Sequence, residues 1–445
     1  MKRTLIHNAI IVNDGVQKQG SVLIEDGVIA QVLTDEKPLT LPYTDFIDAT
    51  GCYLLPGVID EHVHFRDPGL THKADIRTES MAAAAGGVTS IMDMPNTVPQ
   101  TTTLEAWEQK MELMAQKSMV NYACFFGATN TNYDLLRKLD RHRTPGVKLF
   151  MGSSTGGMLV DRTESLKRVF GGTDQVIMAH CEDQHIINEN TQKYRGEHLD
   201  LPIWMHRIIR SSEACYQSTK LAVKLATEAG ARLHIAHLST ARELALLSSE
   251  PMYKKKITAE ACIAHLMFSE EDYKKLGSLI KCNPSVKRKA DKVALRMGLS
   301  SGKIDTIATD HAPHTWEEKY GEALHATSGM PMVQFSLLCM LELVDEGVMS
   351  IEALVEKMCH APARLFGIDR RGYIEKGAWA DLVLVRKGGA WELMPEMILS
   401  KCGWSPLTGH SFRWRVEKTF CNGHLVYDGK SVDETKKGEA LWFNF

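Results

Sequence analysis

Between residues 54 and 308, short apolar runs alternate with longer amphipathic stretches. Each run has about five residues, which suits a buried strand, and each stretch between two runs is long enough for a helix. This alternation predicts βαβ units around a parallel sheet. The predicted strands cover residues 54–59, 88–92, 122–126, 147–150, 176–179, 233–236, 257–260 and 304–308. Eight such strands predict an α/β fold with a closed (β/α)8 barrel of the TIM type.

Both ends of the chain show a different pattern, in which short strands alternate with turn residues. The strands are predicted at 4–7, 9–12, 21–24 and 28–32 before the barrel, and at 372–377, 380–385 and 418–427 after it. The pairs Asp26-Gly27 and Asn422-Gly423 are typical of hairpin turns. We therefore expect residues 1–53 and 372–445 to form one small β-sandwich attached to a barrel of residues 54–371.

Two helical regions support the barrel prediction. Residues 74–86 are rich in alanine and end at Gly86-Gly87, and residues 203–230 contain a long helical pattern that also closes on glycine. A further helical stretch, 330–366, precedes the C-terminal strands. Residues 316–328 are polar, contain glycine and lack periodicity, so we expect a loop there that acts as a lid.

Composition favours a globular protein with a small-molecule partner. Of 445 residues, 44% are hydrophobic and 24% are charged, and the formal net charge is −3. Basic residues are scattered, which argues against nucleic acid or anionic lipid as a partner. The chain shows neither a signal-peptide pattern nor an apolar run of membrane-spanning length, so we expect a cytoplasmic protein. The ten cysteines lack CxxC spacing and are expected to be buried thiols.

Residues 60–69 hold the densest candidate chemistry. His62 and His64 lie two positions apart after an apolar run, so their side chains should project from the same side of a strand. His-x-His pairs also arise by chance, and the pair needs partners. A barrel supplies them, because the carboxyl ends of its strands meet at one mouth. Five predicted strands carry residues suited to binding metal near their ends: His62 and His64, Lys148, His180, His237, and Asp310.

These residues predict a centre with two metal ions. Four imidazoles and a carboxylate suit zinc or a similar divalent ion, and they exceed what one tetrahedral site uses. As an ammonium, Lys148 would be repelled, but its product with CO2 is a carbamate whose two oxygens can bridge two ions. We therefore predict two zinc ions per subunit, bridged by carboxylated Lys148. Singly, each residue has a structural alternative: Lys148 could pair with a buried carboxylate, and His180 or His237 could be a core histidine bonded to backbone.

Four segments together resemble the dihydroorotases of the amidohydrolase superfamily. They are Asp60–Gly69 (DEHVHFRDPG), Met94–Thr97 (MPNT), Gly146–Phe150 (GVKLF) and Asp310–Lys319 (DHAPHTWEEK). The resemblance covers nearly the whole chain. It implies reversible, zinc-dependent cyclisation of N-carbamoyl-L-aspartate to L-dihydroorotate, a step of pyrimidine (UMP) biosynthesis.

The resemblance also implies how the metal ligands divide. It assigns His62 and His64 to one zinc ion, and His180 and His237 to the other. Lys148 is the carboxylated bridge; some monofunctional long-chain relatives carry aspartate at that position, whereas this chain keeps lysine.

The implied mechanism uses a metal-bound hydroxide that attacks the ring amide. Asp310 would be a ligand of the first ion and the proton shuttle. Arg66, Asn96 and His314 would hold the α-carboxylate of the substrate, and Asn283 would lie near its ring. A planar guanidinium suits this task, because it can hold a carboxylate with two parallel hydrogen bonds.

Several alternatives stay open at this point. Arg66 could form a salt bridge with Asp67 or Glu61, and Asn96 could be a turn residue. The enzyme could be a related cyclic amidohydrolase of the hydantoinase, dihydropyrimidinase or allantoinase type. A metal-free pseudoenzyme could instead serve as a scaffold for a transcarbamoylase. We also expect a homo-oligomer, with a dimer favoured.

Overall fold

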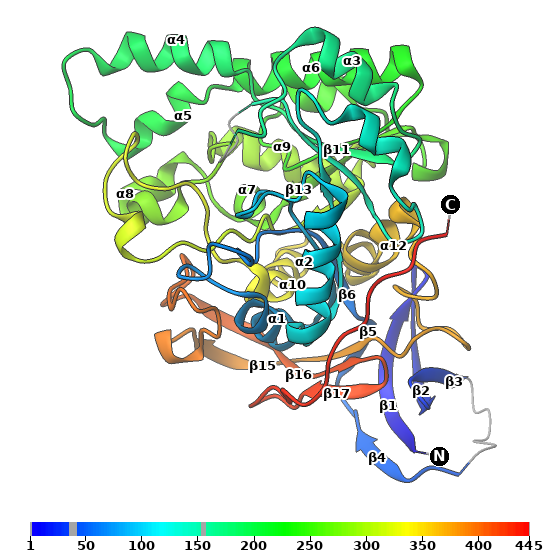
Figure 1. Cartoon of the computed structure of the whole chain (residues 1–445). Helices are drawn as coiled ribbons and strands as arrows, with labels where there is room; N and C mark the ends of the chain where they lie inside the picture. The colour runs from blue at the N-terminus through cyan, green and yellow to red at the C-terminus, as the bar shows by residue number, and fades with distance from the viewer. Residues whose placement is uncertain (1, 35–41, 153–156, 445) are drawn as a thin grey trace.

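The computed structural model describes residues 2–34, 42–152 and 157–444. Within these ranges, eight parallel strands form the predicted barrel, with helices around it (Figure 1). The barrel strands are β6 (Val58–Val63), β7 (Val88–Asp93), β8 (Asn121–Cys124) continued by β9 (Phe126–Gly127), β10 (Gly146–Phe150), β11 (Val176–His180), β12 (Arg232–Ile235), β13 (Ile257–Cys262) and β14 (Thr306–Ala308). A parallel bridge between Val63 and His311 joins β6 to the segment after β14. This bridge closes the ring and confirms the predicted barrel.

The first predicted strand, 54–59, is wrong in extent, because the chain passes from one sheet to another at Gly57. Its first half is β5 (Tyr53–Pro56), which pairs with strands from the two ends of the chain. Only the second half belongs to the barrel. A Cβ at Gly57 would lie 2.1 Å from Oγ1 of Thr89, so only glycine fits at this crossing point.

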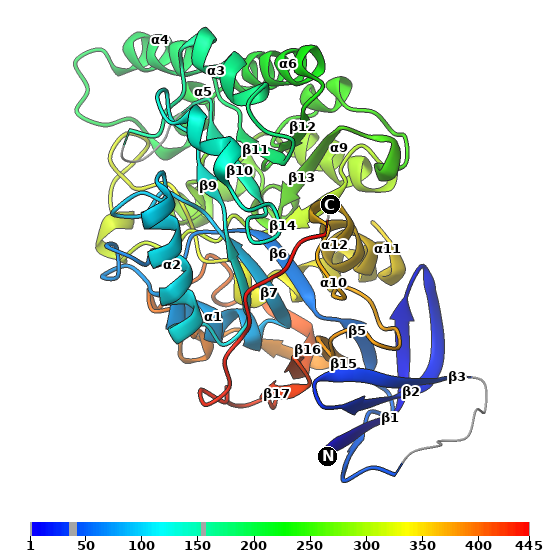
Figure 2. The ribbon, with the colours of Figure 1, turned by 45° about the vertical axis from the view of Figure 1, so that its right-hand side comes forward.

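Strands from both ends of the chain form one hydrogen-bonded sheet below the barrel (Figures 1 and 2). Along the sheet the order is β17-β16-β15-β5-β1-β2-β3, and β4 also pairs with β1. The terminal strands are β1 (Arg3–Asn13), β2 (Val16–Glu25), β3 (Val28–Thr34), β4 (Asp45–Asp48), β15 (Leu382–Glu392), β16 (Ser411–Cys421) and β17 (His424–Tyr427). Since β5 pairs with β1 on one side and β15 on the other, it joins the two ends. The prediction that the termini share one β unit is confirmed.

Turn residues account for both a correct and a wrong prediction in this sheet. Asp26-Gly27 and Asn422-Gly423 have positive φ at both positions and connect β2 to β3 and β16 to β17, as predicted. The predicted strand 372–377 does not form. Gly372 and Gly377 have φ of 83° and 89°, and this left-handed backbone breaks the strand.

The last residues of the chain leave the terminal sheet and return to the barrel. Tyr122 in β8 forms a parallel bridge with Ala440, and Ile368 forms an antiparallel bridge with Phe443. Figure 2 shows this C-terminal segment, in red, running upward along the barrel.

Helices cover the barrel between successive strands. The longer ones are α1 (Ile76–Ala85), α2 (Leu104–Lys117), α3 (Thr163–Phe170), α4 (Gln184–Arg195), α6 (Ser212–Ala229), α9 (Lys289–Ser300) and α10 (Ser336–Asp345). Shorter ones are α5 (His206–Ile209), α7 (Ile263–Met267), α8 (Tyr273–Leu276), α11 (Ile351–Val355) and α12 (Ala361–Phe366), with a π-helical turn, Glu356–His360, between the last two. The predicted helix 74–86 is confirmed as α1, which a capping box at Asp75 starts.

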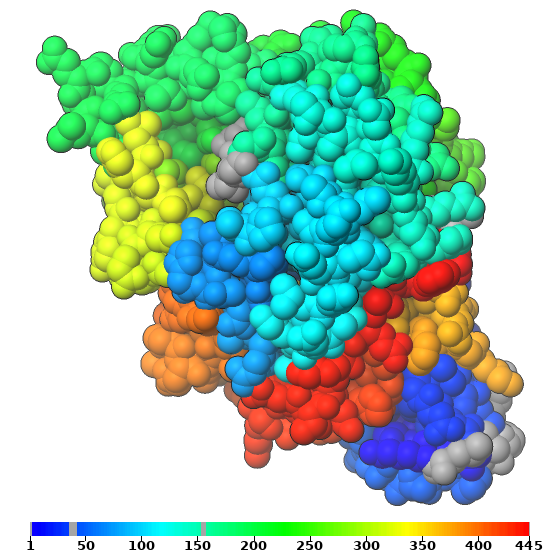
Figure 3. Space-filling view, viewed as in Figure 1, coloured from blue at the N-terminus to red at the C-terminus, as the bar shows by residue number. Residues whose placement is uncertain are grey.

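The predicted helix 203–230 is three elements: a 3-10 turn (Ile203–Met205), α5 and α6. Ser211 breaks it, because its extended backbone (ψ 162°) and its side chain, which accepts from the amide of Ala214, make it the N-cap of α6. Figure 3 shows the green region around α4 projecting from the barrel at the upper left, away from the blue N-terminal strands.

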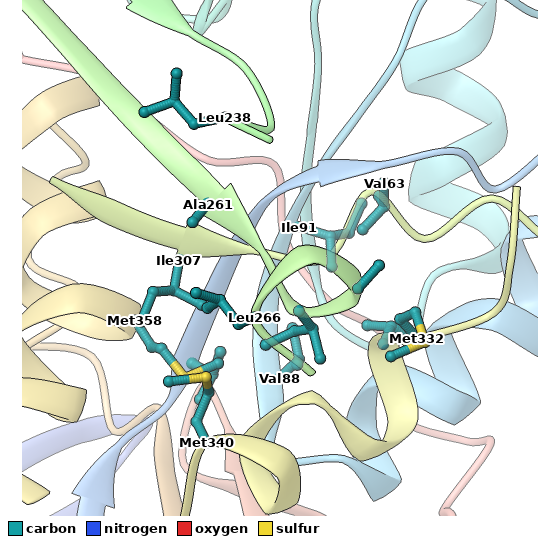
Figure 4. Close-up of a cluster of buried hydrophobic side chains, with 14 of the residues drawn as sticks. Val63, Val88, Ile91, Leu238, Ala261, Leu266, Ile307, Met332, Met340 and Met358 are labelled. Carbon is teal, nitrogen blue, oxygen red and sulfur yellow. The ribbon is translucent and has the colours of Figure 1, made fainter. Parts of the chain in front are cut away.

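Apolar side chains fill the space between the strands and the helices. Figure 4 shows Val63, Ile91 and Ile307 of the strand segments packed near methionines of the covering segments, among them Met332 and Met340. Burial of this surface is the main stabilising contribution to the barrel. No helix among the described residues is both long and apolar enough to cross a membrane.

Candidate active site

A cavity of ≈470 Å³ lies at the carboxyl ends of the barrel strands. All ten predicted site residues contribute to its lining: His62, His64, Arg66, Asn96, Lys148, His180, His237, Asn283, Asp310 and His314. The barrel thus brings together residues that lie up to 252 positions apart in the sequence, from His62 to His314. We call His62, His64, Lys148, His180, His237 and Asp310 the donor cluster.

One half of the donor cluster gathers around Asp310. The Nε2 atoms of His62 and His64 lie 3.4 and 3.1 Å from Oδ1 of Asp310. Nζ of Lys148 lies 3.2 Å from Nε2 of His62. The ligand atoms of His62, His64 and Asp310 all fall within 4.8 Å of one another, which is close enough for one ion to reach all three.

The other half consists of His180 and His237. Nδ1 of His180 lies 2.9 Å from Nε2 of His237, and the two rings meet edge to face. The ring of His237 also lies 5.2 Å from that of His62, so the two halves are in contact. The six side chains therefore form one continuous group of donor atoms that lines the cavity.

The outward nitrogens of three histidines are held by oxygen atoms. Nδ1 of His62 bonds to the carboxylate of Glu260. Nδ1 of His64 lies 2.8 Å from Oδ1 of Asn96, and Nε2 of His180 lies 3.1 Å from Oε2 of Glu182. Metal-binding histidines usually have such a partner, because it fixes the tautomer and turns the other nitrogen toward the ion. The buried His311 has such a partner too, since its Nε2 lies 2.8 Å from Oε2 of Glu79, so it is the convergence of the three rings on the cavity that sets them apart.

Glu260 and Glu182 are functional candidates that the sequence prediction missed. Glu260 lies in β13, the seventh barrel strand, and also accepts from the backbone N–H of His237 at 2.9 Å. Glu182 follows His180 by two residues and forms an ion pair with Arg210. Both are buried carboxylates beside the strand ends, and that position was the available signal.

Electrostatics keep the donor cluster in the protonation states that bind cations. Burial lowers the pKa of His64 to about 4 and lowers the pKa of His180 and His237 as well. Burial alone would raise the pKa of Asp310, but the neighbouring His62 and His64 outweigh it and hold that pKa well below its usual range. His64, His180 and His237 are therefore neutral imidazoles near the ionised carboxylate of Asp310, and these are the forms that ligate metal. The residues present therefore fit zinc or a similar divalent ion.

Lys148 is an ammonium or amine in a wholly buried position. Burial lowers its pKa, although the carboxylates of Glu260 and Asp310 act in the opposite direction. A lowered pKa favours the neutral amine, which is the form that can react with CO2.

A second group of residues, Arg66, Lys73 and His314, forms what we call the cationic pole of the cavity. Nη2 of Arg66 lies 3.0 Å from Nε2 of His314, and Nζ of Lys73 lies 3.3 Å from Nδ1. Burial and the neighbouring cations Arg66 and Lys73 hold the pKa of His314 far below its usual range, so its ring is neutral. Lys73 was not predicted, since a lysine three residues before the start of α1 carries no strand-end signal.

The salt bridges proposed as alternatives for Arg66 do not form. Asp67 pairs with Lys117 at 2.7 Å, and Nε of Arg66 donates to the carbonyl of Pro313 at 2.9 Å. Among the described residues, no carboxylate is within ion-pair distance of Arg66. A buried guanidinium without a carboxylate partner in the protein is suited to an anionic ligand.

Backbone conformation marks three of these positions. Arg66, His237 and Asp310 have φ of 67°, 37° and 50°, in the left-handed region that side-chain-bearing residues seldom adopt. Such strain persists where the surrounding structure fixes a residue for function.

Asn283 completes the lining, and its buried Oδ1 accepts no hydrogen bond from the described residues.

Comparison with known proteins agrees with this geometry. Residues 53–426 match the model of the amidohydrolase family. A dihydroorotase of Halobacterium salinarum is 36% identical over 391 residues, covering 87% of this chain and 89% of the relative. A dihydroorotase of Methanosarcina acetivorans is 31% identical over 449 residues, covering 98% of this chain and 94% of the relative.

Among solved structures, an L-hydantoinase (dihydropyrimidinase) from Arthrobacter aurescens superposes with a TM-score of 0.91 at 28% identity, covering 97% of this chain and 98% of that one. A dihydropyrimidinase from Brevibacillus agri, at 23% identity and a TM-score of 0.86, shares the fold. These matches confirm the predicted enzyme class and the fold: the chain belongs to the amidohydrolase family.

Proposed function

We propose that this amidohydrolase is a dihydroorotase, which interconverts N-carbamoyl-L-aspartate and L-dihydroorotate in pyrimidine biosynthesis. The observation that carries the proposal is the pairing of the donor cluster with the cationic pole in one cavity. Dihydroorotate needs both, because it has a ring amide to be cleaved and a carboxylate to be held. The curated relatives named dihydroorotase support this choice.

The proposal includes two zinc ions. His62, His64 and Asp310 would hold one ion, His180 and His237 would hold the other, and a carbamate on Lys148 would bridge them. A bound zinc ion polarises a carbonyl oxygen and lowers the pKa of a water molecule to about 7. The convergent, neutral imidazoles and the outward nitrogens held by Glu260 and Glu182 support this assignment.

Asp310 is the proposed proton shuttle. Its carboxylate points toward His62 and His64 and also lines the cavity, so it can reach a substrate that lies against the donor cluster. Its lowered pKa keeps it ionised, and an ionised carboxylate can accept the proton of the attacking water in the hydrolytic direction. It then gives that proton to the departing ring nitrogen, and the cyclisation direction reverses both transfers.

Arg66, Asn96 and His314 are proposed to hold the α-carboxylate. The guanidinium of Arg66 offers a planar fork, and the neutral ring of His314 lies beside it. Asn96 would have two tasks. Its Oδ1 orients the ring of His64, and its side-chain amide nitrogen would donate to the substrate carboxylate. Asn283 would lie near the ring.

A hydantoinase or dihydropyrimidinase is the second candidate, because the L-hydantoinase structure matches this fold at a TM-score of 0.91. A hydantoin or dihydropyrimidine ring, like allantoin, would use the same donor cluster. The cationic pole favours dihydroorotate, since a neutral ring would leave buried Arg66 without an anion. A metal-free scaffold is disfavoured because all six members of the donor cluster are present and converge.

We extend the proposal to the organisation of the protein. It would consist of a barrel that ends at residue 371 and begins at Gly57 rather than at residue 54, and of a β-sandwich of residues 1–56 and 372–445, because β5 pairs with the terminal strands. It would form a cytoplasmic homodimer acting on a small-molecule substrate. Light scattering on the purified protein tests the dimer, with a mass of one 49.7 kDa chain as the contradicting result.

Metal removal tests the function. The purified protein is assayed for dihydroorotate hydrolysis before chelation, after chelation and after zinc is restored, with the metal content measured each time. We expect activity to fall with the metal content and to return with zinc. Hydrolysis that persists in metal-free protein would contradict the metal assignment, and the absence of hydrolysis at full metal content would contradict the substrate.

A further inference from the structure

Lys319 lies outside the ten predicted residues, yet its ammonium is buried beside the cationic pole. The residue is 2% exposed and ends a 3-10 turn (Glu317–Lys319). Nζ donates to three backbone carbonyls: those of Thr327 and Gly329 at 2.8 Å each, and that of Lys281 at 3.3 Å. Within the described ranges, no carboxylate forms an ion pair with Lys319. Carbonyl dipoles, rather than a carboxylate, therefore stabilise this buried cation.

The carbonyls that Lys319 holds lie on both sides of Ser328. The carbonyl of Ser328 itself lies 3.0 Å from Nε2 of His314. Thr327, Ser328 and Gly329 also line the cavity. One ammonium thus fixes a row of three residues, and the middle residue of that row contacts the imidazole of the cationic pole.

Further contacts make the row a rigid wall. The amide of Gly329 donates to the carbonyl of Lys281 at 2.8 Å, and the amide of Thr327 donates to that of Glu318 at 3.0 Å. On the other side, Nε1 of Trp404 donates to the carbonyl of His314 at 2.8 Å, and its ring lies 5.6 Å from Nζ of Lys319. Within the predicted lid, 316–328, the Lys319 side chain joins residue Thr327 to Gly329 and Lys281, which lie outside that segment.

We propose that Lys319 is a positioning residue that fixes the carbonyl row Thr327–Gly329 against His314 and so determines how tightly the cavity holds a substrate carboxylate. This inference rests on the proposed function for the identity of the substrate. The ammonium contributes twice, through its three hydrogen bonds and through a positive charge beside Arg66 and His314, which lowers the pKa of His314. A residue that only stabilised the fold would affect every substrate alike.

The test replaces Lys319 by methionine, which keeps the length of the side chain and removes its donors and charge. We expect KM for dihydroorotate to rise about tenfold while kcat changes by less than about threefold, because the lost interaction serves binding rather than chemistry. Turnover of dihydrouracil, which has no carboxylate, should stay within about twofold of the wild type. In Lys319→Gln, which keeps an amide donor, KM for dihydroorotate should lie between the values for Lys319→Met and the wild type.

Hydrogen exchange supplies a readout that does not depend on the substrate. Amides of residues 321–330 should exchange faster in Lys319→Met, because the carbonyl row is no longer held. Lys255→Met is the matched control: its side chain is 3% exposed and pairs with Asp305 away from the cavity. This control should alter neither the exchange of 321–330 nor KM.

Two results would overturn the inference. Unchanged exchange of residues 321–330 in both Lys319 variants would show that Lys319 does not hold the row, whatever the substrate. If exchange were faster but the Lys319 variants lost activity equally toward dihydroorotate and dihydrouracil, Lys319 would have only a structural role. A wild-type enzyme that hydrolyses dihydrouracil but not dihydroorotate would contradict the proposed function instead, and the exchange measurement would still decide whether Lys319 positions the row.

Discussion

The donor cluster and the cationic pole face the same cavity but are built in different ways. The donor cluster comes from side chains at the carboxyl ends of rigid barrel strands, and buried carboxylates hold the outward nitrogens of His62 and His180. The cationic pole comes from loops: backbone carbonyls of Pro313 and Ser328 contact Arg66 and His314, and the partly exposed carboxylate of Glu318 pairs with Lys73 at 2.8 Å and lies 3.3 Å from His314. Under the proposed function, strand ends would supply the hydrolytic chemistry, whereas loops would supply the choice of substrate.

The largest expected effect comes from breaking the donor cluster at Asp310. Asp310→Asn keeps the shape but removes the proton acceptor, so we expect kcat for dihydroorotate to fall by about 10³-fold. The measurement is kcat at saturating zinc, with the metal content determined on the same sample. Asp369→Asn, at an exposed carboxylate bonded to Asn444, is the control. A kcat within about threefold of the wild type would rule out the shuttle.

Removing the guanidinium tests the cationic pole alone. In Arg66→Met we expect KM for dihydroorotate to rise by about 50-fold, because charge-assisted hydrogen bonds contribute about 1.5–3 kcal/mol. Dihydrouracil turnover should change little, since that ring has no carboxylate. Arg143→Met, at an exposed pair with Glu108, serves as the control. An unchanged KM would show that Arg66 does not bind the carboxylate.

A smaller effect is expected from the carboxylate behind the donor cluster. Glu260→Gln weakens the partner of His62, and such changes typically lower metal affinity by about 10- to 100-fold. Competition with a chelator of known affinity measures the change. Glu243→Gln, a buried carboxylate bonded instead to Thr219 and Thr240, is the matched control and should leave metal affinity unchanged. If Glu260→Gln and Glu243→Gln had equal metal affinities, Glu260 would not position His62 for metal binding.

The smallest expected effect is a pH dependence at the cationic pole. Burial, with repulsion from Lys281 and Arg66, lowers the pKa of Lys319 to about 7, although the thiols of Cys282 and Cys402 act in the opposite direction. Below that pH an ammonium has three donors for three carbonyls, and above it the amine has two. We expect KM for dihydroorotate to rise about threefold between about pH 6 and about pH 8.5. If KM for dihydroorotate depended on pH in the same way in Lys319→Met, a group other than Lys319 would cause the rise in KM.

The sequence predicted the donor cluster better than the cationic pole, for a physical reason. In a barrel, the end of each strand has a known destination, so His180 and His237 could be placed together from a strand count. No such rule fixes where a loop residue lies. Arg66 and His314 entered only through the resemblance, and Lys73 and Lys319 were missed.

Errors in the predicted fold lie where tertiary contacts override a local pattern. The apolar run 54–59 reads as one strand, but Gly57 lets the chain pass close to Thr89 and change sheets. The helical pattern 203–230 continues across Ser211, where capping of α6 ends the preceding turn. Glu260 was assigned only to a strand, because its role depends on His62, which lies 198 positions away in the sequence.

The most direct test compares two substrates on one enzyme. If one cavity combines the donor cluster with a carboxylate-binding pole, the zinc-loaded wild type should show a kcat/KM for dihydroorotate at least about 100-fold above that for dihydrouracil. A ratio at or below one, at full metal content, would contradict this, and would identify the protein as a hydrolase of uncharged rings.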